Sequence, residues 1–223
     1  MIKQLKWAWA IAALTLLAGI VTLFYVDGST ELPIKWTVGE EIDNGTSAWI
    51  SFLTLPFLQF ILLALFSSLK ILEPRQQNLK NSTKALLAIA LSMTCVLLIV
   101  QATFISMSMG YEVLDDSAIL VGLGLMFLVT GNYLGKLRSS FFIGIRTPWT
   151  LSSDEVWQRT HRLAGRLFMV AGLVMIVASL ALHSRHLPLI ATAVLLPAVI
   201  IPVVYSWLLW RAEQQKTKKP EQE

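Results

Sequence analysis

The sequence predicts an all-α, polytopic membrane protein, a bundle of six transmembrane helices with both termini in the cytoplasm. Three observations lead to this fold class. Of the 223 residues, 55% are hydrophobic and 14% are charged, whereas a soluble domain carries about 25% charged residues. The apolar residues gather in six runs that are long enough to cross a bilayer. The Lys and Arg residues fall almost entirely on one side of those runs.

The six runs form one membrane domain, residues 1–210, which a charged tail at 211–223 follows. The predicted spans cover about residues 7–26, 48–72, 85–109, 117–134, 164–182 and 187–210. No small-x-small cleavage pattern follows the first run, so we expect a retained helix rather than a signal peptide. Pro56 predicts a kink or an early break in the second run. Gly122, Gly124 and Gly131 predict that the fourth span closely approaches a neighbouring helix.

The connecting segments alternate in charge. The segment 27–47 is acidic, whereas 70–84 and 135–166 are basic. With the amino terminus inside, 16 of the 18 Lys and Arg residues fall in inside segments, and the other two, Lys35 and Arg185, fall outside. This distribution follows the positive-inside rule and sets the orientation. The basic excess therefore requires no nucleic-acid partner.

Nothing in the sequence indicates an enzyme, a cofactor or a metal site. The middle of each span lacks ionisable side chains, which a proton relay or an ion-coupled pump would use. Gln101 and Asn132 are expected to form hydrogen bonds between helices. Cys95 is the single cysteine and His161 stands alone, so neither is part of a metal-ligand pattern. No phosphate-binding loop, nucleophile elbow or zinc-protease motif occurs.

The long basic interval from Phe141 to Arg162 has the most varied chemistry in the chain. Thr147-Pro148 restricts the backbone, which predicts a rigid turn that holds Arg146 and Trp149 in a fixed relation. Ser152 with Glu155 fits a capping box and predicts that a helix begins there.

That helix is predicted to be amphipathic and to lead into the fifth span. One face carries Val156, Trp157, Thr160, Leu163, Ala164 and Leu167, and another carries Arg159, Arg162 and Arg166. Glu155 is placed to pair with Arg159 four residues later. Two interpretations stay open. The helix either anchors the segment on anionic lipid, or it is a docking surface for a cytoplasmic protein or another part of the bundle.

The first outer loop contains an apolar and aromatic group, Leu32 to Trp36, among acidic residues. One interpretation is an interfacial anchor. The other is a contact surface for an amphipathic or cationic peptide that arrives from outside and is attracted by the surrounding acids. Under the second interpretation the candidate contact residues are Pro33, Lys35 and Trp36.

The run from Ile143 to Leu151, followed by Val156-Trp157, resembles the signature of the SdpI family of bacterial membrane immunity proteins. The segment 110–113, the glycine-rich fourth span and the pair Pro33 and Trp36 add to the resemblance, which extends over most of the chain through the order of the spans. Lys35 departs from the histidine that is common in the family. The resemblance implies that the functional residues are Gly144, Arg146, Thr147, Pro148, Trp149, Thr150 and Trp157.

The resemblance also implies a function: a multi-pass protein of the bacterial plasma membrane that protects its producer from a secreted peptide toxin. In the best-known member it further implies a signal-transducing receptor that holds a cytoplasmic transcriptional repressor at the membrane. The expected partners are therefore the toxin, the repressor and membrane lipids. An alternative hypothesis is a small transporter or flippase with Pro56, Pro197 and Pro202 as hinges. A third is a structural anchor whose basic helix recruits a soluble partner.

Overall fold

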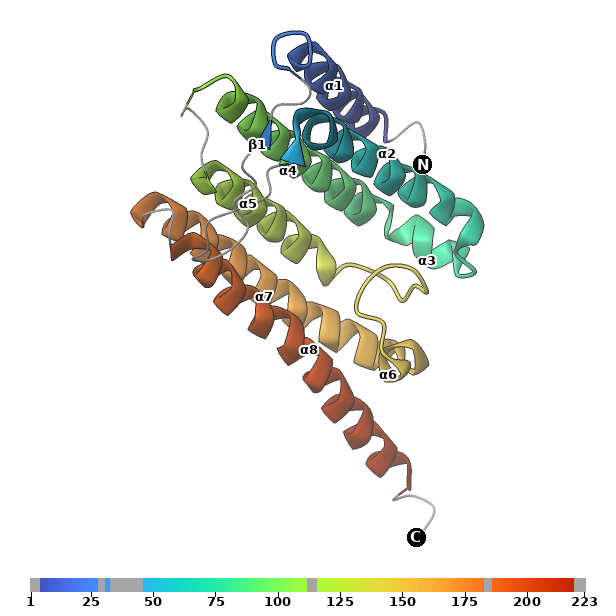
Figure 1. Cartoon of the computed structure of the whole chain (residues 1–223). Coiled ribbons are helices and arrows are strands. Elements are labelled where there is room, and N and C mark those ends of the chain that lie inside the picture. Colours follow the sequence, from blue (N-terminus) through green and yellow to red (C-terminus); the bar gives the residue numbers. More distant parts are fainter. Residues whose placement is uncertain (1–4, 28–30, 33–45, 112–115, 183–185, 219–223) are drawn as a thin grey trace.

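The computed structural model describes residues 5–27, 31–32, 46–111, 116–182 and 186–218, and this part of the chain is helical apart from two very short strands (Figure 1). The described helices are α1 (Lys6–Thr22), α2 (Ala48–Leu72), α3 (Gln76–Asn81), α4 (Thr83–Ser108), α5 (Asp116–Leu134), α6 (Pro148–Ser152), α7 (Asp154–Ala181) and α8 (Leu187–Lys218). The strands β1 (Glu31–Leu32) and β2 (Thr46–Ser47) pair antiparallel in the first long connection.

Five of the described helices, α2, α4, α5, α7 and α8, are long and apolar enough to cross a membrane. Helix α1 is equally apolar but has 17 residues. The predicted first span reached residue 26, whereas α1 ends at Thr22 and the chain continues in turns that end with a hydrogen bond from the Val26 amide to the Thr22 carbonyl (3.0 Å). The helical membrane fold class is confirmed by this composition.

The helix bounds agree with the apolar runs in the middle of the chain and differ in the last helix and in the basic connector. The helix α2 coincides with the predicted second span and continues through Pro56, so the early break, one of the two effects predicted for this proline, is absent. As predicted, the amphipathic helix leads into the fifth span, and the two are one continuous helix, α7. The last helix, α8, does not end at Trp210 but continues to Lys218. The basic connector 70–84 contains a short helix, α3, that the sequence did not predict.

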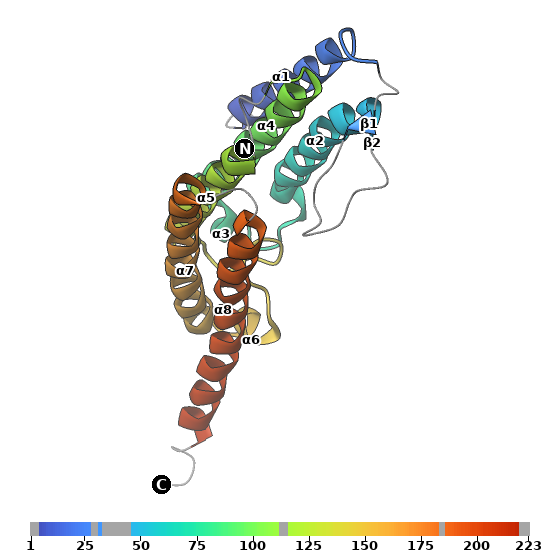
Figure 2. The same ribbon diagram turned by 60° about the vertical axis from the view of Figure 1, so that its left-hand side comes forward.

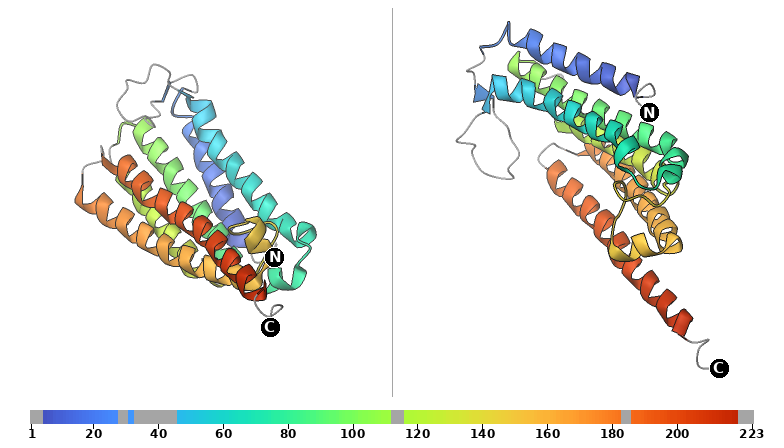
Figure 3. Two further views of the ribbon diagram at one scale, coloured as in Figure 1. Left: turned by 90° about the horizontal axis from the view of Figure 1, so that it is seen from below. Right: turned by 90° about the vertical axis from the view of Figure 1, so that its right-hand side faces the viewer.

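The helices form two groups of three. Helices α1, α2 and α4 pack on one another, as do α5, α7 and α8, and α4 packs on α5 to join the groups (Figure 2). The start of α1, the helices α3 and α6, and the end of α8 lie at the same end of the bundle (Figures 1 and 3). We call this the connector end, and α8 protrudes beyond it (Figure 1).

Glycines bring α5 and α7 into backbone contact. A Cβ atom added at Gly131 would lie 2.6 Å from the Gly165 carbonyl oxygen, and one added at Gly165 would lie 2.6 Å from the Gly131 oxygen. Gly124 and Gly172 face each other in the same way, at 2.7 and 2.4 Å. The prediction that the fourth span closely approaches a neighbour is confirmed, and the neighbour is α7.

Buried carboxamides connect the helices of the first group. The Gln101 Nε2 atom of α4 donates to the Phe52 carbonyl of α2 (3.2 Å), as predicted. Gln59, which the sequence analysis did not single out, donates in the opposite direction, from α2 to the Thr94 carbonyl (3.1 Å). The prediction was wrong for Asn132, which is exposed at the end of α5 and accepts from Lys136 Nζ within the same segment (3.4 Å).

Candidate functional site

The segment 141–153, which we call the motif loop, closes the connector end between α5 and α7. Its centre is α6, which begins at Pro148 because proline needs no hydrogen-bond acceptor at the first helical position. Thr147 Oγ1 accepts from the Thr150 amide (3.2 Å), and Thr150 Oγ1 accepts from the Thr147 amide (2.9 Å), which forms a capping box. Thr150 Oγ1 also donates to the Ile145 carbonyl (2.9 Å). The rigid turn is therefore present, and the two threonines stabilise it.

The predicted capping box of Ser152 and Glu155 was wrong by one residue. Helix α6 includes Ser152, whose hydroxyl donates to the Trp149 carbonyl (3.0 Å), so the extended residue before α7 is Ser153. The Ser153 hydroxyl caps α7 by accepting from the Val156 amide (3.3 Å). The predicted pairing of Glu155 with Arg159 is confirmed, at 2.6 Å on the helix surface.

The motif loop is attached to α8 through Trp149. Its indole Nε1 donates to the hydroxyl of Ser206, a fully buried serine of α8, and its ring lies 6.4 Å from the ring of Trp210. A second attachment comes from the Ser153 hydroxyl, which donates to Glu213 Oε1 (3.0 Å). The Trp149 side chain therefore makes its contacts within the molecule, with α8.

On the other side of the loop, Gly144 lies directly over two buried rings of α7. It has a φ of +106°, and a Cβ atom there would lie 2.4 Å from His161 Nε2 and 2.9 Å from the Trp157 ring. Trp157 and His161 are stacked with 4.0 Å between ring centroids, and both are fully buried. The Trp157 indole donates to the Leu137 carbonyl (3.0 Å). His161 Nε2 accepts from the Ile145 amide (2.9 Å), so the imidazole holds the loop in place.

This acceptor role assigns the neutral His161 ring a proton on Nδ1, which donates to the Trp157 carbonyl (2.8 Å). The sequence showed His161 only as a lone imidazole. Its position one helical turn after Trp157 is the signal that relates it to the motif, because residues four apart share a helix face.

Arg146 and Pro148 are exposed, unlike the motif side chains that pack inside the protein. Gly144, Thr147, Trp149, Thr150 and Trp157 all contact other parts of the protein. Arg146 is exposed, and its guanidinium donates to the Phe141 carbonyl (3.0 Å). The turn thus directs the Arg146 guanidinium to the surface and the Trp149 indole toward α8.

A buried carboxylate that the sequence analysis missed anchors the start of the motif loop. Glu73, at the end of α2, is 1% exposed, and its carboxylate accepts from the Ser140 hydroxyl (2.5 Å) and from the amides of Phe141 (3.1 Å) and Arg75 (3.1 Å). Burial alone raises the pKa of this carboxyl, but these hydrogen bonds outweigh burial and lower the pKa below its ordinary value. Glu73 is the single acid in the basic connector 70–84, which was the available signal.

Two further residues of the connector bind the same segment. The Arg75 guanidinium donates to the Ser139 hydroxyl and lies over the Phe141 ring at 4.8 Å. The Asn78 amide donates to the Ser139 carbonyl (2.9 Å). We call Glu73, Arg75, Asn78, Ser139 and Ser140 the polar latch. It joins the first helix group to the motif loop.

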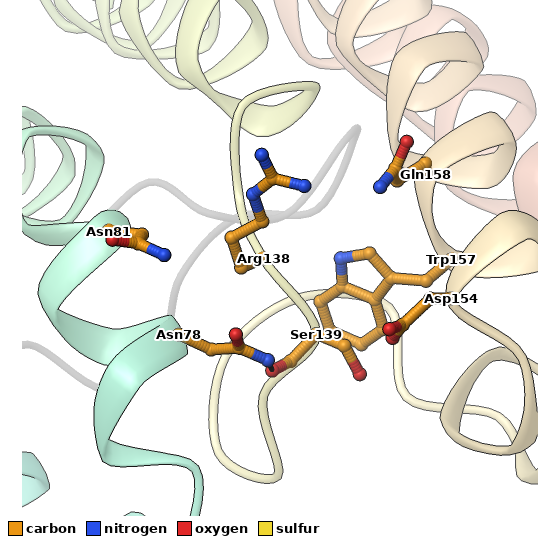
Figure 4. Close-up of a pocket in the computed structure, with 7 residues that line it drawn as sticks. All are labelled: Asn78, Asn81, Arg138, Ser139, Asp154, Trp157 and Gln158. Carbon is orange, nitrogen blue, oxygen red and sulfur yellow. Dashed lines mark hydrogen bonds between the residues drawn. The ribbon is translucent and has the colours of Figure 1, made fainter.

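A small polar cavity lies beside the latch. Its volume is about 170 Å³, and it is lined by Asn78, Asn81, Arg138, Ser139, Asp154, Trp157 and Gln158. Figure 4 shows Arg138 between the α3 asparagines and Gln158 of α7. Within the described ranges, no group of three or more His, Cys, Asp or Glu residues is placed to hold a metal ion. The outer-loop candidates Pro33, Lys35 and Trp36 lie outside the described residues.

The fold and the site define a class, a multi-pass membrane protein in which a motif loop connects the helix groups at one end. The model of the SdpI/YfhL protein family matches residues 136–206, which include the whole motif loop. Immunity protein SdpI of Bacillus subtilis (strain 168) is 30% identical over 198 residues, which are 88% of this chain and 91% of that protein. No solved structure matches the chain. The chain belongs to the SdpI/YfhL family, which is not known for enzymatic activity.

Proposed function

We propose that this protein is an immunity protein that protects its own cell from a secreted peptide toxin acting at the plasma membrane. The observation that carries the proposal is the similarity to Immunity protein SdpI over nearly the full length of both chains. The family match over the motif loop supports it further, because that loop holds the resemblance noted in the sequence.

We also propose six spans with both termini in the cytoplasm. Helix α1 packs in the bundle beside α2 and α4, and the turns after it extend the apolar segment to Val26. The start of α1 and the end of α8 share the connector end (Figure 3), where most Lys and Arg residues lie. The positive-inside rule favours the cytoplasm for that end. An alkaline phosphatase reporter fused after Lys218 should therefore be inactive, and an active reporter contradicts the orientation.

A signalling role fits the exposed position of Arg146. The loop around it is hydrogen-bonded to Glu73 at the end of α2, to His161 of α7 and to Ser206 of α8. We propose that toxin binding changes the position of Arg146 through these contacts. We propose that a cytoplasmic repressor of the immunity operon docks at Arg146. A fluorescent repressor should move to the membrane on toxin addition in wild-type cells and stay in the cytoplasm with Arg146→Ala.

The protection assay tests the main proposal. A toxin-sensitive bacterium that expresses this protein should survive doses that kill the same strain with an empty vector. In the repressor assay above, Lys80→Ala is the matched control for Arg146→Ala, because Lys80 is also an exposed cation at the connector end but lies on α3. The proposal is overturned if cells with the protein in their membrane are killed at the same toxin dose as cells with the empty vector.

A further inference from the structure

We infer that α5 and α7 carry a binding site for the headgroup of an anionic phospholipid, built from Lys136, Arg162 and Arg166. The inference goes beyond the proposed immunity function and does not depend on it. Four observations carry it: a helix face that changes from basic to apolar, the depth of its cations, the approach of Lys136, and the absence of competing carboxylates among the described residues.

One exposed face of α7 changes character along its length. Residues that recur at spacings of three and four share a helix face. Near the start of α7 this face carries the exposed Arg159, Arg162 and Arg166. It continues with exposed apolar side chains, Val170 (59%), Leu173 (55%), Val177 (56%) and Leu180 (79%). Such a stripe fits a lipid-facing surface whose basic part lies at headgroup level.

The lengths agree with this placement. At a rise of 1.5 Å per residue, Arg166 lies roughly 21 Å and Arg162 roughly 27 Å along the helix from Leu180. The hydrocarbon core is about 30 Å thick, so with Leu180 near its far edge both arginines reach the opposite interface. Their aliphatic stems lie along the apolar surface while the guanidinium groups reach the phosphate layer.

Helix α5 adds a third cation to this patch. Because α5 and α7 touch through their glycines, the end of α5 lies on the stem of Arg162, and a Cβ atom added at Gly135 would lie 3.3 Å from Arg162 Cγ. Lys136 follows Gly135 and is exposed. Its ammonium lies 4.9 Å from the centre of the Tyr133 ring. Aromatic rings of this kind are common at the membrane interface.

The charges of the patch are not neutralised within the described ranges. Glu155 pairs with Arg159 (2.6 Å), so Arg159 is left out of the proposed site. The described residues give Lys136, Arg162 and Arg166 no carboxylate partner. Arg162 donates to the neutral Gln158 side chain (3.2 Å). A phosphodiester that accepts from guanidinium groups complements three such cations, and the adjoining apolar stripe accommodates its acyl chains.

Lipid retention in nanodiscs tests the site. The full chain is reconstituted in discs of dioleoyl phosphatidylglycerol and dioleoyl phosphatidylcholine, and native mass spectrometry measures which lipid stays bound. The wild type should retain phosphatidylglycerol. Each basic residue near an anionic surface contributes about fivefold to affinity, so the variant K136Q/R162Q/R166Q should bind on the order of a hundredfold more weakly.

The variant K80Q/K84Q/K216Q is the matched control, because it removes three exposed cations that belong to other helices, α3, α4 and α8. It should retain phosphatidylglycerol as the wild type does. Equal retention by the α5–α7 variant, or an equal loss in the control, overturns the site. Circular dichroism in pure phosphatidylcholine discs checks the fold. Should the triple variant unfold, R166Q alone decides, and wild-type retention by R166Q then contradicts the proposal.

Discussion

Gly144 occupies a position where a side chain does not fit. The backbone there has a positive φ, and the two buried rings of Trp157 and His161 fill the space that a Cβ atom would take. The family resemblance includes this glycine, and the geometry gives a physical reason for it. The residue sets how closely the motif loop lies on α7, and through the Ile145 amide it keeps His161 engaged.

We expect Gly144→Ala to lower the free energy of unfolding by about 1–3 kcal/mol, because it combines backbone strain with overlap against His161. Thermal unfolding in detergent micelles measures the change. Gly110→Ala is the matched control, since Gly110 also has a positive φ (75°) but no atom lies within 4 Å of its added Cβ. The control should lose only about 1 kcal/mol. Equal decreases in the free energy of unfolding in both variants contradict the proposed close packing of Gly144 on the Trp157 and His161 rings.

Glu73 makes part of the stability depend on pH. Its folded-state pKa lies below the ordinary value of 4.5, so its contribution is complete above pH 4.5 and is lost as the pH falls through the lowered value. Glu73→Gln should therefore lower stability at pH 7 by about 1.5–3 kcal/mol. The difference from the wild type should shrink as the pH is lowered below 4.5. A difference that stays constant over this pH range counts against the latch carboxylate.

At the scale of the elements, the glycine contact sets the distance between α5 and α7. Gly165→Ala places a methyl group 2.6 Å from a backbone oxygen of α5, which cannot move alone. We expect a loss of about 1–3 kcal/mol and a lower melting temperature. Gly122→Ala is the comparison, because its Cβ would meet the flexible end of Ile99 at 3.0 Å. Gly122→Ala should lower the free energy of unfolding by less than Gly165→Ala does. A larger decrease in Gly122→Ala contradicts this order.

The contact between α6 and α8 combines the hydrogen bond from Trp149 to Ser206 with the packing of the Trp149 ring beside Trp210. Trp149→Phe removes the donor and keeps most of the ring, so it should cost about 1 kcal/mol. Hydrogen exchange should become faster at the α6 amides and remain unchanged in α1. Ser206→Ala added to Trp149→Phe should cause little further loss if the two residues act as a pair. Fully additive losses indicate that the bond is not formed.

The positions of the helices could be predicted well from the sequence, whereas the contacts between them could not. The second span was predicted to the residue because apolar runs define membrane helices by their length. The Thr147–Thr150 turn is local, so a rigid turn was also within reach. The contacts of Ser206 and Glu73 were not, because their partners Trp149 and Ser140 lie 57 and 67 residues away. Polar pairs that are so far apart in the chain leave no periodic pattern in the sequence from which they could be predicted.

At the scale of the whole molecule, the connector end holds the polar contacts that link the two helix groups through the motif loop. The polar latch attaches the group of α1, α2 and α4 to the motif loop, and Trp149 attaches the loop to α8. Both helix groups are therefore connected through the motif loop at this end.

The membrane potential of toxin-treated cells tests the central claim most directly. A potential-sensitive dye is followed in a sensitive bacterium that carries this protein, and in the same strain with an empty vector, after the secreted peptide toxin is added. We expect the potential to persist in the cells with the protein and to collapse in the vector cells. Collapse at the same dose and rate in both strains, with the protein present in the membrane, contradicts an immunity function.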